Sequence, residues 1–210
     1  MMTTAVLVPF KGDRYKSRLA PVLDAEQRKQ FAYLLLESVL GAIAEAGLRR
    51  DSCVISPDPE AWARASRAGV SYLRERADAG VNAAVRRGMR RLANRDSFMV
   101  LPSDLALLTA PDIKHAMRIG RDASLVIAPS SSFNGTNLLM FPRRFGRFLS
   151  YDDNSFWNHL DAAASLGLRT TVVTRKALVF DVDTPQDAAE FADLHANTRA
   201  GRFLGRLRSA

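Results

Sequence analysis

Short apolar runs alternate with amphipathic segments along the whole 210-residue chain. The apolar runs predict strands at 5–10, 52–56, 70–73, 98–101, 123–129, 137–141, 169–173 and 178–182. Strands separated by helical segments are typical of a mostly parallel sheet with helices on both faces. Because no repeat, linker or change of composition interrupts this pattern, we expect a single α/β domain.

Capping signals mark the starts of several predicted helices. Asp24 and Gln27 form a capping box, and apolar residues then recur at every fourth position until Gly47. The predicted buried stripe of this helix is Phe31, Leu35, Val39 and Ile43. Thr109 and Thr184 each precede a proline and an aspartate in a first helical turn. The same spacing predicts the buried face of a later helix at Phe156, Leu160 and Ala164.

Composition places the chain among ordinary globular proteins, since 47% of its residues are hydrophobic and 25% are charged. The apolar run at 5–10 ends at Lys11 and is too short for a signal peptide or a membrane span. Cys53 is the single cysteine, so a disulfide within the chain is impossible. We therefore expect a cytoplasmic protein that does not contact a membrane.

The net charge of +8 favours an anionic partner. Two arginine clusters supply most of the excess, at Arg86, Arg87, Arg90, Arg91 and Arg95, and at Arg199, Arg202, Arg206 and Arg208. Neither cluster has the interleaved aromatic residues or the motifs of a nucleic-acid-binding module. We expect a solvated helix face and a loosely ordered basic tail at 199–210, which follows a domain at 1–198. A basic nucleic-acid-binding protein remains the rival hypothesis from outside the enzymes.

Charged residues follow two of the predicted strands. Pro102 ends the run at 98–101, and Asp104 comes directly after it. Ligands of open α/β sheets bind beyond the carboxyl ends of the strands, although an aspartate there can also cap a turn. Lys11, Lys16 and Arg18 lie in the loop after the first strand and indicate an anion site, with an exposed surface loop as the alternative.

Further candidates come from the second half of the chain. The polar loop at 130–137 can hold an anion or be a plain surface loop. Asp181 and Asp183 project to one side of a predicted strand, because strands alternate with a period of two. Asn82 lies near a helix start, where it can cap the helix or bind a nucleotide. Carboxylates suit Mg²⁺, which commonly takes one or two of them together with substrate phosphates.

Several familiar catalytic motifs are absent from the sequence. It contains no G-x-x-x-x-G-K-[ST] phosphate loop, no G-x-G-x-x-G after the first strand and no G-x-S-x-G elbow. His115, His159 and His195 lack the spacing of zinc ligands. The remaining candidates are oxygen ligands and cations, which together indicate phosphate-transfer chemistry without a phosphate loop.

Seven motifs occur in the order in which one family carries them. They are Val8-Pro-Phe-Lys11, Lys16-Ser-Arg-Leu19, Gly80-Val-Asn82, Leu101-Pro-Ser-Asp-Leu105 with Leu107-Leu108-Thr109, Gly135-Thr-Asn137, Ser155-Phe156 with His159, and Asp181-Val-Asp-Thr-Pro185. From Val6 to about Leu194 the chain resembles the 2-phospho-L-lactate guanylyltransferase family of deazaflavin coenzyme F-420 biosynthesis. The resemblance implies a single-domain, Rossmann-like nucleotidyltransferase (GT-A-like) fold with a mostly parallel central sheet flanked by helices.

The resemblance also implies a reaction and its partners. Members of the family transfer GMP from GTP to a small phosphorylated three-carbon acid and release pyrophosphate. The acid is 2-phospho-L-lactate, phosphoenolpyruvate or 3-phospho-D-glycerate. The expected partners are therefore GTP and such an acid, while the next enzyme of the coenzyme pathway and a homodimer are open alternatives. Nucleotidyl transfer to a sugar phosphate or molybdopterin is the runner-up, but those enzymes usually carry a glycine-rich first loop.

Matching motifs carry roles onto this sequence. The implied ligands of Mg²⁺, with Mn²⁺ as an alternative, are Asp104, Asp181 and Asp183. The implied GTP-binding residues are Lys11, Lys16, Arg18, Asn82 and Ser103. The implied acceptor-binding residues are Thr136, Asn137, Asp152 and Ser155. The implied catalytic residues are Lys11, Lys16, Arg18 and Asp104.

One segment departs from the family pattern. The family usually has a glycine-rich G-x-G-S-F turn, and this chain has Asp152-Asp-Asn-Ser-Phe156 instead. Glycine lets backbone N–H groups approach an anion closely. Two aspartates would repel a carboxylate, or they would require another metal ion or an acceptor that bears a hydroxyl group. The sequence therefore leaves the identity of the acceptor open.

Overall fold

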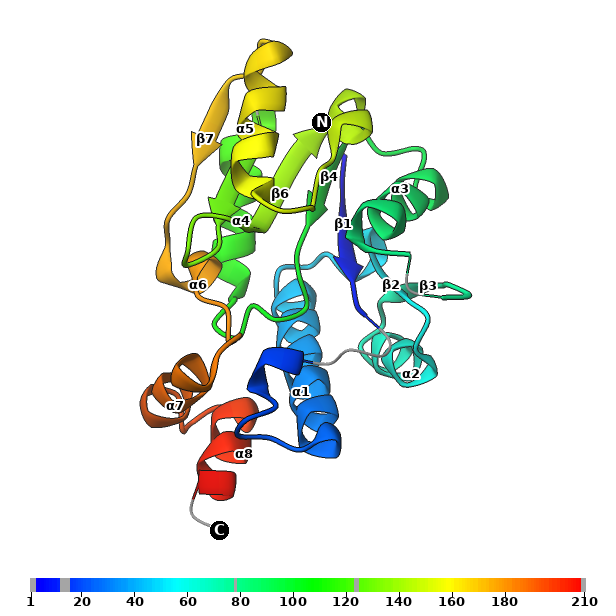
Figure 1. Ribbon diagram of the computed structural model, residues 1–210. Helices are drawn as coiled ribbons and strands as arrows, with labels where there is room; N and C mark the ends of the chain where they lie inside the picture. Colours follow the sequence, from blue (N-terminus) through cyan, green and yellow to red (C-terminus); the bar gives the residue numbers. More distant parts are fainter. Residues whose placement is uncertain (1–2, 12–15, 78, 123–124, 209–210) are drawn as a thin grey trace.

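A computed structural model describes residues 3–11, 16–77, 79–122 and 125–208 (Figure 1). Its strands form one sheet in the order β3-β2-β1-β4-β6-β5-β7. Their bounds are β1 Thr4–Pro9, β2 Ser52–Ser56, β3 Ser71–Arg74, β4 Ser97–Val100, β5 Leu125–Pro129, β6 Thr136–Pro142 and β7 Thr170–Val172. Every neighbouring pair is parallel except the two that involve β6. The start of β6 therefore lies at the same edge as the carboxyl ends of the parallel strands.

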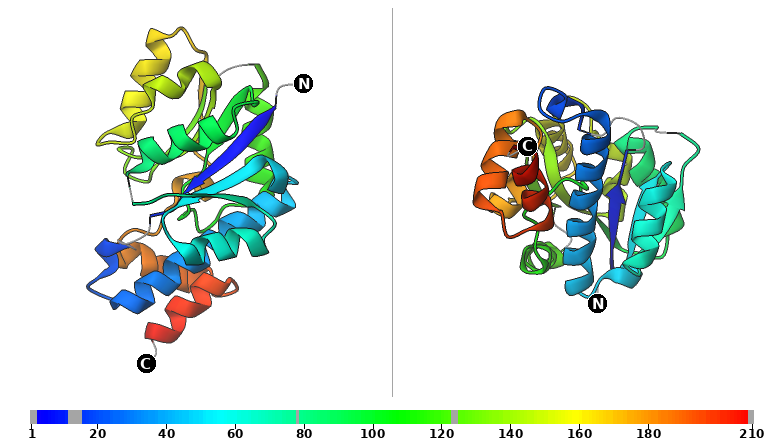
Figure 2. Two further views of the ribbon diagram at one scale, coloured as in Figure 1. Left: turned by 90° about the vertical axis from the view of Figure 1, so that its right-hand side faces the viewer. Right: turned by 90° about the horizontal axis from the view of Figure 1, so that it is seen from below.

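Helices cover both faces of this sheet (Figure 2). Their bounds are α1 Ala25–Glu45, α2 Pro59–Arg67, α3 Val81–Arg91, α4 Ala110–Ile119, α5 Ser155–Ser165, α6 Lys176–Val179, α7 Pro185–Leu194 and α8 Arg199–Arg208. None of the helices in the described ranges combines the length and the hydropathy that a bilayer crossing needs. The expected α/β class, with a mostly parallel sheet flanked by helices, is confirmed.

Alternation along the strands builds two cores, one on each face of the sheet. In β1, Val6 and Val8 join the core under α1, α2 and α4, whereas Ala5 and Leu7 join the core under α3 and α5. This division follows from the period of two along a strand. Both faces of β1 are buried, as its uninterrupted apolar run predicts.

Most helix starts match their capping signals. The side chain of Asp24 accepts a hydrogen bond from the backbone N–H of Gln27, and the side-chain oxygen of Gln27 accepts one from the backbone N–H of Asp24. Thr184 and Asp187 form the same reciprocal pair at α7. The four stripe residues predicted for α1 are all buried.

The predicted face of α5 is only partly right. Phe156 is buried, but Ala164 is exposed, and the side chains that point inward are Ser155, His159 and Ala163. The apolar spacing could not show this, because two of these inward residues are polar. Burial of His159 is important for the site described below.

The strand expected at 178–182 is wrong. Residues Lys176–Val179 form a single helical turn, α6, that places Leu178 in the core. The residues that follow it, 180–183, belong to no strand of the sheet. A short apolar run fits a buried helical turn as well as a buried strand, so its pattern does not distinguish them.

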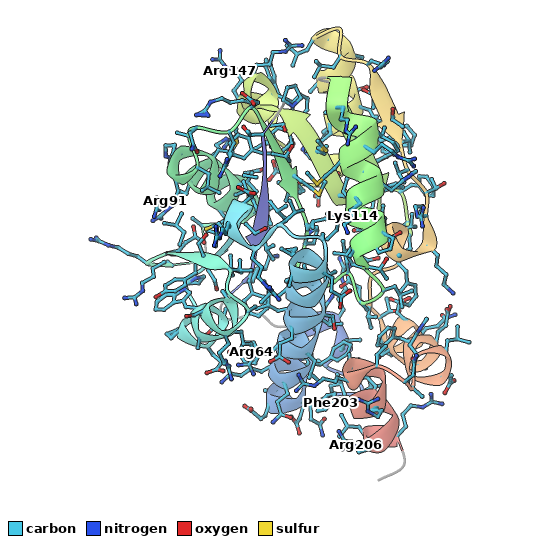
Figure 3. The ribbon with its side chains drawn as sticks, turned by 180° about the vertical axis from the view of Figure 1, so that it is seen from behind. Arg64, Arg91, Lys114, Arg147, Phe203 and Arg206 are labelled. Atoms are coloured by element: carbon cyan, nitrogen blue, oxygen red, sulfur yellow. The ribbon has the colours of Figure 1, made fainter. Side chains whose placement is uncertain are left out.

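The C-terminal arginines do not belong to a loosely ordered tail. Residues Arg199–Arg208 form helix α8, which buries Ala200 and Leu204 in a third core with α1 and α7. Arg199 pairs with Glu37 at 2.7 Å and Arg208 pairs with Asp193 at 2.6 Å. From behind, Phe203 and Arg206 of α8 and Arg64 of α2 lie around one end of α1 (Figure 3). The solvated face expected for the other cluster is found at the exposed residues Arg86, Arg90 and Arg91.

Candidate active site

A cavity of about 830 Å³ opens at the edge where the parallel strands end. Its walls come from the segments that follow β1, β3 and β4, from the loop before β6, from the start of α5, and from residues 181–187. Every candidate site residue named from the sequence lines this cavity except Asn82, which lies in the first turn of α3 beside Val81 of its wall. The topology thus brings residues that lie far apart in the sequence, such as Lys11 and Asp187, to one cavity.

One end of the cavity is charged and is centred on Lys16. The ammonium Nζ of Lys16 lies 3.0 Å from Oδ2 of Asp104 and 2.8 Å from Oδ1 of Asp183. Its side chain is only 9% exposed. Lys16 has φ 43, in the left-handed region, and directly precedes the short helical turn Ser17–Leu19, where Leu19 is buried. That turn aims the ammonium inward.

The opposite charges of Lys16 and Asp183 determine the protonation state of both side chains. Burial alone would lower the pKa of Lys16, but the carboxylates of Asp104 and Asp183 raise it well above its ordinary value. Burial alone would raise the pKa of Asp183. The positive charges of Lys16 and Arg18 outweigh burial and lower this pKa below its ordinary value. Both groups are therefore charged at neutral pH.

Asp181 behaves differently from its neighbours. Burial, together with the negative charges of Asp104 and Asp183, raises its pKa from 3.8 to about 6. Lys16 opposes the rise but does not cancel it. The charged end therefore holds three carboxylates around one buried ammonium, and the other described cations of this end, Arg18 and Lys11, are exposed.

Several carboxylates that lie close together suit a divalent cation. Among the residues that the structure describes, no three His, Cys, Asp or Glu side chains are grouped closely enough to hold a metal ion. Mg²⁺ needs only one or two protein carboxylates, because water and phosphate oxygens complete its shell. Asp104 and Asp183 meet that need, and Lys16 Nζ lies between them. The predicted three-carboxylate site stays a prediction.

Other predicted residues surround this end. Arg18 is 76% exposed and reaches Asp183 at 3.3 Å. Lys11 is exposed at the cavity wall, and its charge also lowers the pKa of Asp183. Ser103 lies in the same wall, one residue before Asp104. Cations and carboxylates from the two ends of the chain thus meet here.

The opposite end of the cavity is neutral and built of hydroxyl groups. Thr136 begins β6 and Ser155 begins α5, and the Ser155 hydroxyl donates to Oγ1 of Thr136 at 3.1 Å. Nδ1 of His159 lies 3.1 Å from the same oxygen. All three residues are buried, and Thr136 and Ser155 line the cavity.

The tautomer of His159 follows from its neighbours. The backbone N–H of Ser150 donates to Nε2 of His159 at 3.1 Å, so Nε2 carries no proton. Burial lowers the pKa of His159 to about 4, against the opposing charge of Asp152, and the ring is neutral at pH 7. Nδ1 must then hold the proton and donate it to Thr136. Because Thr136 accepts twice, its own hydroxyl proton remains for an oxygen in the cavity.

The aspartate-rich turn adjoins this neutral end. Asn82 donates its amide to both carboxylate oxygens of Asp152, at 3.3 and 3.2 Å, and accepts from the backbone N–H of Tyr151 at 2.8 Å. Asn154 has φ 60, a left-handed conformation that asparagine tolerates better than most residues. The turn therefore keeps a conformation that suits glycine, although its side chains differ from the family pattern.

Asn137 holds in place the segment that carries Asp181 and Asp183. Its amide donates to the carbonyl of Val179 at 2.9 Å, and so ties the start of β6 to the segment that leads to Asp181 and Asp183. This contact does what the missing strand ladder would have done. It fixes two carboxylates on a segment that belongs to no strand.

The chain matches the model of the family described as "Guanylyl transferase CofC like" over residues 4–210. It belongs to this family. A phosphoenolpyruvate guanylyltransferase of Rubrobacter xylanophilus is 35% identical over 192 residues, which cover 90% of this chain and 93% of that protein. A 3-phospho-D-glycerate guanylyltransferase of Phenylobacterium zucineum is 32% identical, with 99% and 98% covered. A 2-phospho-L-lactate guanylyltransferase of Methanothermobacter thermautotrophicus is 30% identical, with 99% and 92% covered.

Solved structures share the fold of this guanylyl transferase family member. A protein from Desulfovibrio desulfuricans described as a nucleotide-diphospho-sugar transferase superposes with a TM-score of 0.79 at 13% identity, and covers 100% of this chain and 96% of its own. A nucleotidyl transferase from Methanothermobacter thermautotrophicus has a TM-score of 0.69 at 16% identity, with 97% and 99% covered. The expected nucleotidyltransferase fold is confirmed.

Three side chains at this site were not predicted to be site residues from the sequence. His159 was noted only as part of a motif, Tyr151 has a buried hydroxyl at the cavity wall, and Glu75 is a buried carboxylate of the same wall. Burial raises the pKa of Tyr151 well above its ordinary value. A position directly after a strand, the rule that found Asp104, could also have found Glu75.

Proposed function

We propose that this protein transfers GMP from GTP to a small phosphorylated three-carbon acid and releases pyrophosphate, as a step of deazaflavin coenzyme F-420 biosynthesis. The observation that supports this most is the division of one cavity into a charged end around Lys16 and a neutral hydroxyl end around Thr136. The charged end suits a triphosphate, and the neutral end suits a small acid. Membership in the guanylyl transferase family narrows the nucleotide to GTP.

The reaction needs no base from the protein. An oxygen of the acceptor phosphate is already an anion at neutral pH, and it attacks the α-phosphorus of GTP. The new O–P bond forms as the bond from the α-phosphorus to the bridging oxygen of the β-phosphate breaks, and that oxygen leaves with pyrophosphate. The protein then contributes alignment and charge stabilisation, which carry most of the catalysis in phosphoryl transfer.

Cations at the charged end serve the leaving group. Lys11, Lys16 and Arg18 are placed to neutralise the negative charge that develops on pyrophosphate. Asp104 and Asp183 would hold Mg²⁺, with Mn²⁺ as an alternative, and Asp181 lies beside them. When bound, this ion supplies positive charge to the phosphates. Ser103 completes the wall beside the metal ligands.

Hydroxyl groups at the neutral end serve the acceptor. The hydroxyl of Thr136 has its proton available for a carboxylate oxygen of the acid, and Ser155 lies beside it. Asn82 and Asn137 act indirectly. The side chain of Asn82 holds the turn at 151–152, and that of Asn137 holds the segment before Asp181. We assign these two residues to positioning rather than to direct contact.

The aspartate turn favours an acceptor with a free hydroxyl group. Asn82 occupies both oxygens of Asp152, whereas Asp153 is exposed at the cavity wall. A carboxylate there repels an acid group and accepts a hydrogen bond from a hydroxyl. Of the three acids, only 3-phospho-D-glycerate carries such a hydroxyl, on its second carbon. We therefore propose it as the preferred acceptor.

The test is pyrophosphate release from GTP and Mg²⁺ with each of the three acids in turn, with ATP and CTP as nucleotide controls. We expect release that depends on both GTP and one acid, and the highest kcat/KM with 3-phospho-D-glycerate. Asp153→Asn should reduce that preference, while Asp161→Asn on the outer face of α5 should not. Silence with all three acids would contradict the proposed reaction. A preference for phosphoenolpyruvate would contradict only the acceptor.

A further inference from the structure

A second, smaller cavity lies against another face of α1. Its volume is about 330 Å³, and its lining residues come from α1, α2 and α8. Leu34 of α1 lines this cavity, whereas the next residue, Leu35, lines the active-site cavity. None of the described residues assigned above to the charged or the neutral end borders it. We call this separate cavity the α8 pocket.

Arginine is the commonest residue in the lining of the α8 pocket. Of eight lining residues, four are arginines and one is a glutamate, Glu37 of α1. The arginines are Arg64 of α2 and Arg199, Arg202 and Arg206 of α8. Figure 3 shows Arg64 on one side of α1 and Arg206 on the other. Guanidinium groups from two helices therefore gather around one carboxylate.

Two of these arginines are held by protein carboxylates. Oε1 of Glu37 lies 3.2 Å from Nε of Arg64, and Oε2 of Glu37 lies 2.7 Å from Nη1 of Arg199. Arg64 also pairs with Glu60 and lies over the ring of Tyr33, 4.2 Å from its centroid. Both oxygens of Glu37 are thus occupied, and Arg64 and Arg199 form a fixed side of the pocket.

The other two arginines have no carboxylate partner among the residues that the structure describes. Arg202 donates to the backbone carbonyl of Asn197 at 2.7 Å, and Arg206 forms neither a hydrogen bond nor an ion pair with any described residue. Both are exposed. Arg199, Arg202 and Arg206 are spaced by three and four residues, which places like charges side by side on one helix face and destabilises the helix. An anion bound here would relieve that repulsion.

The apolar side of α8 fixes the position of these arginines. Leu204 is buried in the core that α8 shares with α1 and α7. The ring of Phe203, which lines the pocket, stacks on Phe31 of α1 with the centroids 6.3 Å apart. The helix that carries Arg202 and Arg206 is therefore anchored on both sides of the two residues, and their charges are preorganised.

We propose that the α8 pocket binds a small anion with two phosphate groups, and that Arg202 and Arg206 supply the free guanidinium groups for it. The planar guanidinium group binds phosphate oxygens in pairs, and several of them are needed to balance a diphosphate. The volume lies near the lower limit for a small-molecule site, which favours free pyrophosphate over the diphosphate of a nucleotide. Because the protein provides the cations, binding needs no metal ion.

The experiment titrates pyrophosphate into the full-length protein in low-salt buffer with EDTA, by calorimetry. We expect the wild type to bind pyrophosphate without metal. Arg202→Gln and Arg206→Gln should each weaken binding about 10-fold or more, since each removes charge-assisted hydrogen bonds. Binding should be lost in the double variant. Because a ligand of the folded state raises the unfolding temperature, pyrophosphate should stabilise the wild type and not the double variant.

Arg208→Gln is the matched control. Arg208 is an exposed arginine of the same helix that pairs with Asp193 at 2.6 Å and does not line the pocket. This variant should bind pyrophosphate as the wild type does. Lys16→Met should also retain metal-free binding, which separates the α8 pocket from the charged end of the active site. Loss of metal-free binding in Lys16→Met with retention in the double variant would overturn the proposal.

Arms with other anions identify the ligand. ADP that binds the wild type and not the double variant supports a diphosphate site and makes a nucleotide its source. Binding of pyrophosphate alone makes the free anion the source. Sulfate that binds as tightly as pyrophosphate would overturn the preference for two phosphate groups. An oligonucleotide that binds far more tightly, through the same arginines, would overturn a small-molecule site.

The outcomes are independent of the proposed function. A wild type that binds no pyrophosphate in EDTA overturns the site even if some variant fails to fold, because this result needs no substitution. A folded double variant that binds as the wild type does overturns the roles of Arg202 and Arg206. Neither result affects guanylyl transfer, since the double variant should release pyrophosphate from GTP at the wild-type rate.

Discussion

The two ends of the cavity solve the problem of buried polar groups in opposite ways. At the neutral end, each hydrogen bond of the Thr136, Ser155 and His159 chain has a donor and an acceptor, and no net charge is buried. At the charged end, Asp104 and Asp183 share the ammonium of Lys16, and the neighbouring Asp181 has a pKa raised to about 6. The neutral end leaves one hydroxyl proton, that of Thr136, for a ligand, whereas the charged end holds three carboxylates around one buried ammonium.

The two ends of the cavity therefore contribute differently to the stability of the fold and to substrate binding. A satisfied hydrogen-bond network rigidifies its surroundings and stabilises the fold. A cluster of like charges reduces stability until a cation binds, and it is then a strong binding site. We expect substitutions at the charged end to remove activity while some raise stability, and substitutions at the neutral end to lower both.

The largest effect should come from Lys16→Met. Loss of the ammonium leaves Asp104 and Asp183 without the cation that they share, and removes a charge that serves the leaving pyrophosphate. We expect kcat/KM for GTP to fall about 100- to 1,000-fold, the usual cost of removing one preorganised electrostatic group. Steady-state pyrophosphate release measures it.

Lys176→Met is the control for Lys16, since Lys176 is exposed and forms an ion pair with Glu190 at 3.9 Å, outside the charged end. It should retain wild-type rates. A Lys16→Met protein with more than a tenth of wild-type activity would remove Lys16 from the centre of the charged end.

A smaller effect, confined to the acceptor, should follow substitution of His159. Gln can accept from Ser150 in place of Nε2 but cannot donate from the position of Nδ1, whereas Asn places its amide near that position. We expect His159→Gln to raise the KM for the acid about 10-fold, since one hydrogen bond to Thr136 is lost. His159→Asn should lie nearer the wild type, and the KM for GTP should stay constant in both.

The pH profile adds an independent check on His159. Because burial lowers its pKa to about 4, this histidine should contribute no inflection to kcat/KM between about pH 5.5 and 8, where the ring is neutral throughout. An acceptor-dependent inflection that disappears in His159→Asn would show a ring that titrates near neutral pH. Such a result would contradict the tautomer assigned here.

The smallest expected effect is a gain in stability from Asp181→Asn. The folded-state pKa of Asp181 is raised from 3.8 to about 6, so the folded protein favours the protonated carboxyl. The stability that this group contributes is present below about pH 4 and is lost as the pH rises through 6. Asparagine resembles the protonated form and avoids that loss.

We expect Asp181→Asn to raise the free energy of unfolding at pH 7.5 by about 1–2 kcal/mol, because one pKa unit corresponds to about 1.4 kcal/mol and solvent screens part of the effect. Urea unfolding without metal, repeated at pH 4, measures the difference at both values. The gain should vanish at pH 4. A variant that is less stable than the wild type at pH 7.5 would contradict a raised pKa for Asp181 in the folded protein.

The two ends also differ in how far the sequence could predict them. Asp104 and Lys11 follow buried parallel strands, and the end of a strand is a position that hydrophobic patterning locates well. The interactions of Asp181 and Asp183 could not be derived in this way, because their segment is held by α6 and by Asn137 rather than by a strand ladder.

The neutral end was less accessible to sequence analysis. His159 is buried by tertiary packing and its tautomer depends on the backbone of Ser150, so neither property has a signature in the spacing of residues. Helix α8 illustrates the same limit. Its arginines suggested a solvated tail, and only the packing of Leu204 against α1 and α7 shows a helix that belongs to the core.

The central claim is that the two ends divide the substrates between them, and Thr136→Val tests it most directly. This change removes the hydroxyl at the neutral end and leaves every charge at the other end in place. GTP binding should stay within about 2-fold of the wild type, while kcat/KM for the acid falls about 10- to 100-fold through loss of one or two hydrogen bonds. If the affinity for GTP falls as far as kcat/KM for the acid in a folded variant, the two ends do not act separately.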